Sequence, residues 1–220
     1  MKKVLKYLFL LLTLIFIFGS LFFLLKNLKV QNINCISQFG NCSPDLQAEI
    51  LKAKDKNIFE SFSLLKNSLK KENKVLGYSI NLTLPFNLEI NCIERTPIIA
   101  FNLKNGNFAL VDKDGVIADV AKNTTLPKIL SSTPVSNEQL IFISGLMHSL
   151  NTFYNINEGK ITENGLEISN LNKKRVIFPL SGDKDILLGS LNLILSRLPS
   201  VQEASTISTI DLRFKNPILK

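Results

Sequence analysis

The feature that most constrains this chain is a long uncharged segment near its N-terminus. The residues from Tyr7 to Leu25 read YLFLLLTLIFIFGSLFFLL, and none of these 19 residues carries a charge. As a helix they would extend about 28 Å, close to the thickness of the hydrocarbon core of a bilayer. A cleaved signal peptide has a shorter apolar region that ends in small residues, whereas this segment ends in Phe and Leu. We therefore predict an uncleaved transmembrane helix over residues 7–25.

The charges around this segment predict its orientation. Because positive residues are retained on the cytoplasmic side, we predict a cytoplasmic tail over residues 1–6 and an extracytoplasmic location for the bulk of the chain. The formal charge is +8, from 26 basic and 18 acidic residues. Without the five lysines of residues 1–29 it is 21 minus 18, or only +3, so we expect no nucleic-acid partner. The five flanking lysines are Lys2, Lys3, Lys6, Lys26 and Lys29.

The next stretch, to about residue 97, alternates between strand and helix patterns. Ser43-Pro44 is typical of a helix start, because Ser is a preferred N-cap and Pro fits the first turn. Asn57 with Glu60 three residues later resembles a capping box. Apolar and polar residues alternate in three further runs, as expected for strands. The predicted order is a strand at Val30–Ile36, helices from Ser43 and from Asn57, and strands at Gly77–Leu84 and Leu88–Ile93.

After Pro97 the pattern changes to short runs of alternating apolar and polar residues, which Gly-containing turns separate. Ser136, with Gln139, and Asp183 begin two helices. The apolar stripe predicted for the first is Leu140, Ile143, Met147, Leu150 and Phe153, and that of the second is Leu187, Leu191, Ile194 and Leu198. Thr206–Leu219 reads as one long strand, in which Pro217 favours a position at the sheet edge. The fold class that we predict is α+β, with a mixed, mostly antiparallel second domain. Its other strands are predicted at Ile98–Leu103, Asn107–Val111, Val116–Val120, Leu166–Ser169 and Arg175–Leu180.

Four short motifs occur in a characteristic order. Glu94-Arg95-Thr96-Pro97 ends an alternating strand, and Ala109–Ile117 reads ALVDKDGVI. Leu126-Pro127 and Ile210–Phe214, which reads IDLRF, come next. Each motif alone is weak, but their order and spacing over nearly the whole chain resemble the FtsQ family of bacterial cell-division proteins, called DivIB in Gram-positive bacteria.

The resemblance implies a POTRA domain (β-α-α-β-β) at residues 28–97 and a β domain with two helices at residues 98–220. It also implies a divisome scaffold, a single-pass protein of the cell membrane located at the division septum. Family members bind small coiled-coil proteins of the FtsB (DivIC) and FtsL type and help control septal peptidoglycan synthesis. The alternative that we consider is a membrane-anchored POTRA protein acting as a chaperone in export or envelope assembly.

The resemblance also implies where partners bind. Its match to the D-L-R-aromatic segment assigns Arg213 and Phe214 to the partner contact, and Ile218 would share the face of Phe214 because side chains alternate along a strand. The alternative is that Phe214 packs in the core. Glu94, Arg95 and Pro97 are expected at the domain junction, where Glu94 and Arg95 either bridge the domains or contact a partner.

The three cysteines leave several pairings open. Cys35 and Cys42 are seven positions apart, with a turn between them, and disulfides persist outside the cytoplasm. We predict a Cys35–Cys42 bridge, which would stabilise the fold by roughly 2–3 kcal/mol. The alternatives are a Cys35–Cys92 bridge and three free thiols. We expect no metal site, because the cysteines lack the paired C-x-x-C spacing.

The sequence offers little for catalysis. His148 is the only histidine, and its neighbours in the chain include no carboxylate that would orient it. Asp112 and Asp114 fit a turn and lack the other ligands of a calcium loop. Glycine-rich phosphate-binding motifs and G-x-S-x-G are absent from the sequence. We therefore expect a binding protein rather than an enzyme, with no cofactor and no small-molecule substrate.

Overall fold

The computed structural model describes residues 11–20, 28–83, 85–103, 105–131, 133–171, 173–198 and 206–220. The protein is α+β, and both of its sheets mix parallel and antiparallel strands. The chain separates into two compact units, of which the first ends at Glu94 and the second begins at Arg95. The predicted boundary lies after Pro97. Each unit has its own apolar core.

The transmembrane helix in the predicted fold class is wrong. Residues 11–20 are helical, and they rise only about 15 Å, half of the roughly 30 Å of a hydrocarbon core. Among the residues that the structure describes, no helix combines the length and apolarity that crossing a membrane requires. The remaining residues of the predicted span, 7–10 and 21–25, lie outside the described residues.

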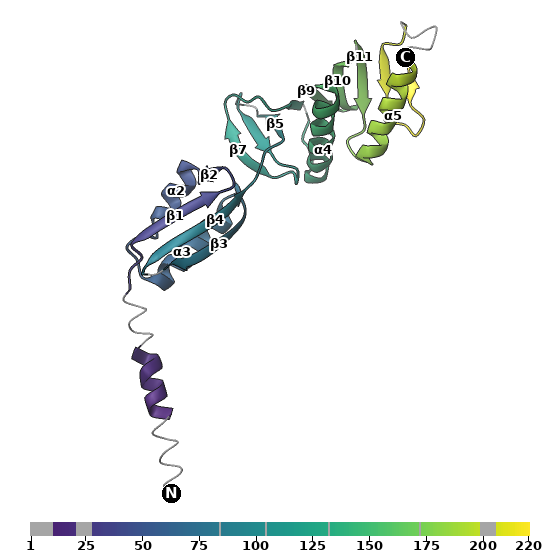
Figure 1. The fold of residues 1–220 in the computed structure, drawn as a ribbon. Coiled ribbons are helices and arrows are strands. Elements are labelled where there is room, and N and C mark those ends of the chain that lie inside the picture. Colours follow the sequence, from purple (N-terminus) through teal and green to yellow (C-terminus); the bar gives the residue numbers. More distant parts are fainter. Residues whose placement is uncertain are drawn as a thin grey trace. The chain divides into compact units, whose positions relative to one another are not determined.

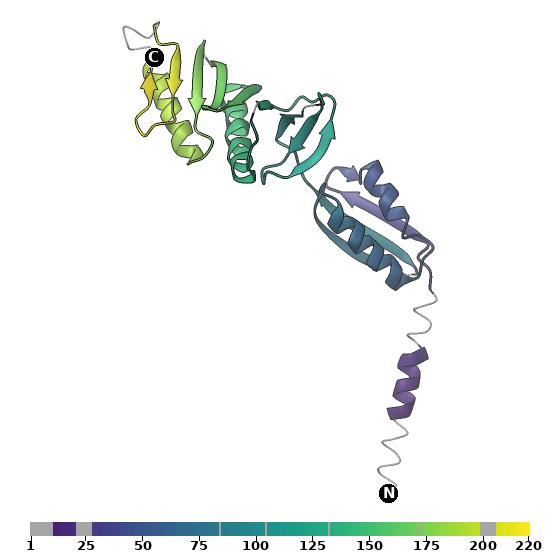
Figure 2. The same cartoon turned by 180° about the vertical axis from the view of Figure 1, so that it is seen from behind.

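The first unit is a sheet with two helices on one face (Figure 1 and Figure 2). Its strand order is β2-β1-β4-β3, in which β1 runs parallel to β4 and the other neighbours are antiparallel. The predicted sequence of strand, helix, helix, strand and strand is present, with the short β2 added. The elements are β1 (Asn32–Ser37), β2 (Gly40–Asn41), α2 (Pro44–Leu51), α3 (Ile58–Lys71), β3 (Val75–Thr83) and β4 (Asn87–Glu94).

Local bonds explain where these helices start. The side chain of Asn57 accepts a hydrogen bond from the Glu60 N–H at 2.9 Å and so satisfies one of the donors that a helix leaves without a partner. Pro44 begins α2, but Ser43 at its N-cap makes no capping bond with its side chain. The apolar faces of both helices pack on the sheet. The core includes Leu46, Ile50, Leu65, Leu69, Leu88 and Ile90.

The second unit contains a sheet of nine strands in the order β13-β12-β11-β10-β9-β8-β5-β6-β7. Antiparallel pairs form both ends, whereas β5, β8 and β9 are parallel to one another in the middle. The sequence did not predict β8 or β9. The strands are β5 (Ile99–Asn102), β6 (Phe108–Val111), β7 (Ile117–Ala121), β8 (Lys128–Ser131), β9 (Glu158–Thr162), β10 (Gly165–Leu171), β11 (Lys174–Phe178), β12 (Thr209–Asp211) and β13 (Ile218–Leu219).

Two helices, α4 (Asn137–Tyr154) and α5 (Lys184–Arg197), lie on one face of this sheet. The predicted capping box of α4 is confirmed, because Ser136 and Gln139 exchange side-chain and backbone bonds. Phe153, predicted in the apolar stripe of α4, is instead 70% exposed. Of that stripe, Ile143, Met147 and Leu150 are buried, and Leu146, which was not predicted, is buried with them.

The predicted long strand Thr206–Leu219 is wrong. Only β12 and β13 are strands in this stretch, and they form an antiparallel hairpin in which Asp211 lies opposite Ile218. The chain bends after β12 because the Asp211 carboxylate accepts a hydrogen bond from the Arg213 N–H two residues on, a turn that Asp favours. The hairpin makes β13 the last strand of the sheet.

Candidate functional site

The open edge of the second sheet lies at β13. Lys220 bonds to Thr209 through both its N–H and its C=O, at 3.0 and 2.8 Å. Backbone groups alternate in direction along a strand, so the N–H and C=O of Leu219 point away from β12. Within the described residues no strand pairs with this side of β13. Another chain could therefore extend the sheet here, although the edge is only two residues long.

Arg213 is held in place by its neighbours. Its Nε and one terminal nitrogen donate to the two carboxylate oxygens of Asp211, at 2.9 and 2.7 Å. Its other terminal nitrogen donates to the backbone oxygen of Asn164 at 3.0 Å. The guanidinium thus satisfies a carboxylate that is only 2% exposed, and its first role is to hold the β12–β13 hairpin.

The pKa of Asp211 lies below its ordinary value of 3.8. The main cause is the side-chain hydrogen bond from Arg213, which favours the ionised carboxylate. Burial acts in the opposite direction but is outweighed. Asp211 is consequently charged at neutral pH, and the ion pair with Arg213 is fully formed there.

Phe214 and Ile218 lie on the surface of the same hairpin. Phe214 is 52% exposed and Ile218 is 38% exposed. The alternative prediction, that Phe214 packs in the core, is therefore wrong. The guanidinium carbon of Arg213 lies 5.5 Å from the centre of the Phe214 ring, within the range of a cation–π contact. Arg213 therefore positions Phe214 as well as binding Asp211.

Two shallow grooves run between α5 and this C-terminal hairpin. One, of about 280 Å³, lies between the start of α5 and the bend that carries Phe214 and Pro217. The other, of about 220 Å³, lies between the end of α5 and Leu219. The exposed apolar side chains along α5 are Ile186 and Leu193. Together the grooves, Phe214 and β13 form an apolar surface beside an open sheet edge, which we call the C-terminal surface.

The residues predicted at the domain junction bond within separate units. The backbone of Glu94, at the end of the first unit, exchanges two hydrogen bonds with the side chain of Gln38, at 2.8 and 2.6 Å. Arg95, at the start of the second, pairs with the buried Asp112 at 2.5 Å and lies 3.6 Å from Asp114. Pro97 lies between Arg95 and β5 along the chain, and its side chain is partly buried.

Asp112 closes a turn, as the sequence predicted. Its Oδ1 accepts hydrogen bonds from the N–H groups of Asp114 and Val116, at 3.0 and 2.8 Å. These bonds close the turn between β6 and β7, and Arg95 compensates the buried charge. Asp112 and Asp114 therefore both belong to the turn, and both form ion pairs with Arg95.

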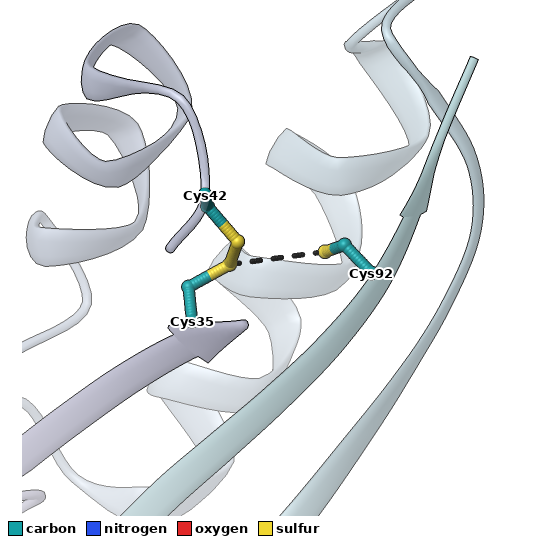
Figure 3. A group of neighbouring side chains, drawn as sticks. All are labelled: Cys35, Cys42 and Cys92. Carbon is teal, nitrogen blue, oxygen red and sulfur yellow. Dashed lines mark hydrogen bonds between the residues drawn. A yellow bond between two sulfur atoms is a disulfide. The ribbon is translucent and has the colours of Figure 1, made fainter. Parts of the chain in front are cut away.

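The three cysteines lie together in the first unit (Figure 3). Cys35 and Cys42 form a disulfide, with a Cα–Cα distance of 5.5 Å. Cys92 is a free thiol whose Sγ lies 3.8 Å from the Sγ of Cys35. Within the described part of the chain, this is the only group of three or more His, Cys, Asp or Glu side chains close enough to share an ion.

The Cys92 thiol is unreactive where it lies. Burial, with the nearby charge of Glu94 as a smaller cause, raises its pKa from 9.0 to about 11. A thiol with so high a pKa is almost entirely protonated at neutral pH, and the thiolate is the nucleophile. Cys92 thus remains a thiol beside an intact disulfide.

The remaining candidate, His148, is an exposed residue of α4. The structure also shows surface residues that the sequence prediction missed, namely Ile186, Leu193 and Leu219. The predicted stripe of α5 contains Leu187 and Leu191, so Ile186 and Leu193 fall outside it. Apolar residues that lie off the buried stripe of an amphipathic helix are the signal that would have identified them.

In comparisons with known proteins, no protein-family model matches the chain, and no curated protein matches it either.

Proposed function

We propose that this protein is a scaffold of the bacterial division machinery that binds small coiled-coil division proteins of the FtsB (DivIC) and FtsL type. Through them it helps control septal peptidoglycan synthesis. The observation that carries the proposal is the C-terminal surface, an open edge at β13 beside the apolar grooves of α5. The order of the motifs from Glu94 to Phe214 supports the same family.

The partner segment that fits this surface combines a helix and a short strand. A strand that adds beside β13 gains only a few backbone bonds, because Leu219 is the residue whose N–H and C=O face outward. Most of the affinity must therefore come from apolar burial. An amphipathic helix lying along α5 would cover Ile186 and Leu193, which accords with a partner whose other regions form coiled coils.

Phe214 and Ile218 are the side chains that we assign to specificity. Exposed aromatic residues beside apolar grooves are typical of the few positions that dominate binding energy. Arg213 contributes by holding Phe214, because all three nitrogens of its guanidinium already donate to Asp211 or Asn164. The protein acts, in this proposal, by binding and positioning other proteins and not by catalysis.

The location that we propose is the outer face of the cytoplasmic membrane at the division septum. The Cys35–Cys42 disulfide supports it, because disulfides persist in oxidising compartments and are rare in the cytosol.

Depletion of the protein tests the function. We expect cells without it to elongate into filaments that lack septa, and the unchanged gene to restore division. Cells that divide normally while export or outer-membrane assembly fails would overturn the proposal in favour of an export or assembly role.

A matched pair of variants tests the surface. We expect Phe214→Ala to weaken partner binding by on the order of 2 kcal/mol, or about thirtyfold. Phe153→Ala, which truncates a more exposed Phe on α4, should bind as the unchanged protein does. Binding of the full-length chain to the purified partner is the measurement, with the melting temperature as the folding control. Equal binding by both variants would show that the C-terminal surface is not the site.

A further inference from the structure

The three cysteines converge from separate parts of the first unit. Cys35 lies in β1, Cys42 lies between β2 and the N-cap of α2, and Cys92 lies in β4. The parallel pairing of β1 with β4 brings Cys92 beside Ser37 and so next to the disulfide. All three side chains are buried, and their sulfur atoms lie within 4.8 Å of one another. Figure 3 shows the three sulfurs directed toward a common point.

This arrangement does not suit thiol–disulfide exchange. Exchange requires the attacking sulfur to lie in line with the bond that breaks. In-line attack by Cys92 on Cys35 would place the Cys92 and Cys42 sulfurs nearly 6 Å apart, because the 3.8 Å approach adds to an S–S bond of about 2 Å. The sulfurs are instead within 4.8 Å, so they form a triangle and not a line.

A triangle of sulfurs suits a single three-coordinate ion. With bonds of about 2.3 Å from ion to sulfur, the three sulfurs lie about 4 Å apart when the ion is in their plane, and about 3.5 Å apart when it lies above that plane, as arsenic(III) does because of its lone pair. Cys35 and Cys92 already have this spacing, at 3.8 Å. Reduction of the disulfide by two electrons and two protons, from a dithiol or phosphine, leaves two thiols. Rotation of the Cys42 side chain then completes the triangle.

The surroundings of the three sulfurs determine which net charge the complex of ion and thiolates can carry. The cysteines belong to the apolar core of the unit, in the same buried cluster as Leu46, Leu88 and Ile90. A net charge is costly in such a place. Three thiolates around Zn²⁺ leave a charge of −1, and around Cu⁺ a charge of −2, whereas around a trivalent ion they leave none. The core therefore favours a trivalent thiophilic ion.

We propose that Cys35, Cys42 and Cys92 form a buried three-sulfur site for one trivalent thiophilic ion, such as arsenic(III), which the disulfide closes and its reduction opens. Arsenous acid, As(OH)₃, reacts with the three thiols. Three As–S bonds form and three As–O bonds break, and each thiol proton leaves with a hydroxide as water. The product carries no net charge.

The test is titration of the full-length chain with arsenite after reduction by a phosphine, which does not compete as a thiol. We expect one arsenic per chain, and the intact mass should show that As(OH)₃ loses three waters on binding, as three As–S bonds require. The melting temperature of the reduced protein should rise, because three sulfurs held together in the folded unit bind the ion more tightly than the separated thiols of the unfolded chain. Zn²⁺ and Cu⁺, tested in parallel, should give smaller increases in melting temperature.

Cys92→Ala is the decisive variant, because it leaves the other two cysteines in place. It should lose the arsenite-dependent rise in melting temperature. The unreduced protein should bind no arsenite. The proposal is overturned if Cys92→Ala binds arsenite as tightly as the unchanged chain, or if the intact mass of the arsenite complex shows that only two waters are lost, so that one As–OH group remains. Either result would show that only Cys35 and Cys42 bind the ion.

Discussion

Asp211 is a carboxylate in the core of the second unit, and a buried charge is tolerated only where its oxygens are satisfied. Arg213 donates to both oxygens from two residues away, so this ion pair forms entirely within the C-terminal hairpin. The same contact bends the chain after β12 and holds Phe214 at the surface. The family resemblance suggested Arg213 as a binding residue, whereas its bonds make it a positioning residue.

The Asp211–Arg213 pair makes the free energy of unfolding depend on pH. Asp211→Asn should cost about 2 kcal/mol at neutral pH, because charge-assisted hydrogen bonds are lost. The pKa of Asp211 is lowered by folding, so its stabilisation is present above 3.8 and disappears as the pH falls through the lowered pKa. The difference between the variant and the unchanged protein should therefore shrink at about pH 3.

Urea unfolding at the two pH values measures this difference. Asp185→Asn is the matched control, because the carboxylate of Asp185 is 87% exposed, and it should cost little at either pH. A cost for Asp211→Asn that is the same at both pH values would contradict the assigned role of the charge.

Gly115 closes the turn between β6 and β7 with a φ of +74°. An added Cβ would lie 2.7 Å from Cγ1 of Ile141, so Gly115→Ala meets both an unfavourable backbone conformation and a clash. We predict a loss of about 2 kcal/mol in the free energy of unfolding. Gly106→Ala has a similar φ of +80° with open space around it, so it should lose only about 1 kcal/mol. Thermal unfolding compares the two, and equal losses would show that the contact with Ile141 is unimportant.

At the scale of elements, helix starts were the most predictable part of the fold. Asn57, Ser136 and Asp183 each accept a hydrogen bond from a backbone N–H of the first turn. These bonds join residues two or three positions apart, so the sequence contains the whole interaction. The central strands β8 and β9 were missed because both are short and because they pair in parallel with strands distant in the chain, although β9 also pairs antiparallel with the neighbouring β10.

Two serines at helix starts allow a matched test of capping. Ser136→Ala should lower the free energy of unfolding by about 1 kcal/mol, because it removes the bond to the Gln139 N–H. Ser43→Ala should change it by less than about 0.5 kcal/mol, because Ser43 makes no such bond. Chemical denaturation of both variants is the measurement. A larger loss for Ser43→Ala would contradict the assignment of the caps.

At the scale of the whole molecule, the two units have separate cores and only the first contains cysteines. A bridge between positions 35 and 42 closes a small loop, so in the chain-entropy model it stabilises its own unit by roughly 2–3 kcal/mol. The second unit contains no part of this loop. Its stability should therefore not depend on the bridge.

Hydrogen exchange after reduction by a phosphine tests that expectation. Amides of β1, β4 and α3 should lose protection, while those of β10, β11 and α4 keep theirs. The same pattern should appear in a Cys35→Ala/Cys42→Ala variant without any reductant. Equal loss of protection in both units would mean that the chain unfolds as one cooperative body.

The sequence by itself determined the interactions between near neighbours. Caps, the Asp112 turn, the alternation of β1 and β4 and the short separation of Cys35 from Cys42 all depend on residues a few positions apart. The tertiary structure decided what depends on distant pairing. It placed Cys92 beside the disulfide, put β8 and β9 in the middle of the sheet, folded the C-terminus into a hairpin and left Phe153 exposed. The reason is physical, because a local hydrogen bond requires only its own few residues, whereas the partner of a strand or a thiol is set by which surfaces pack together.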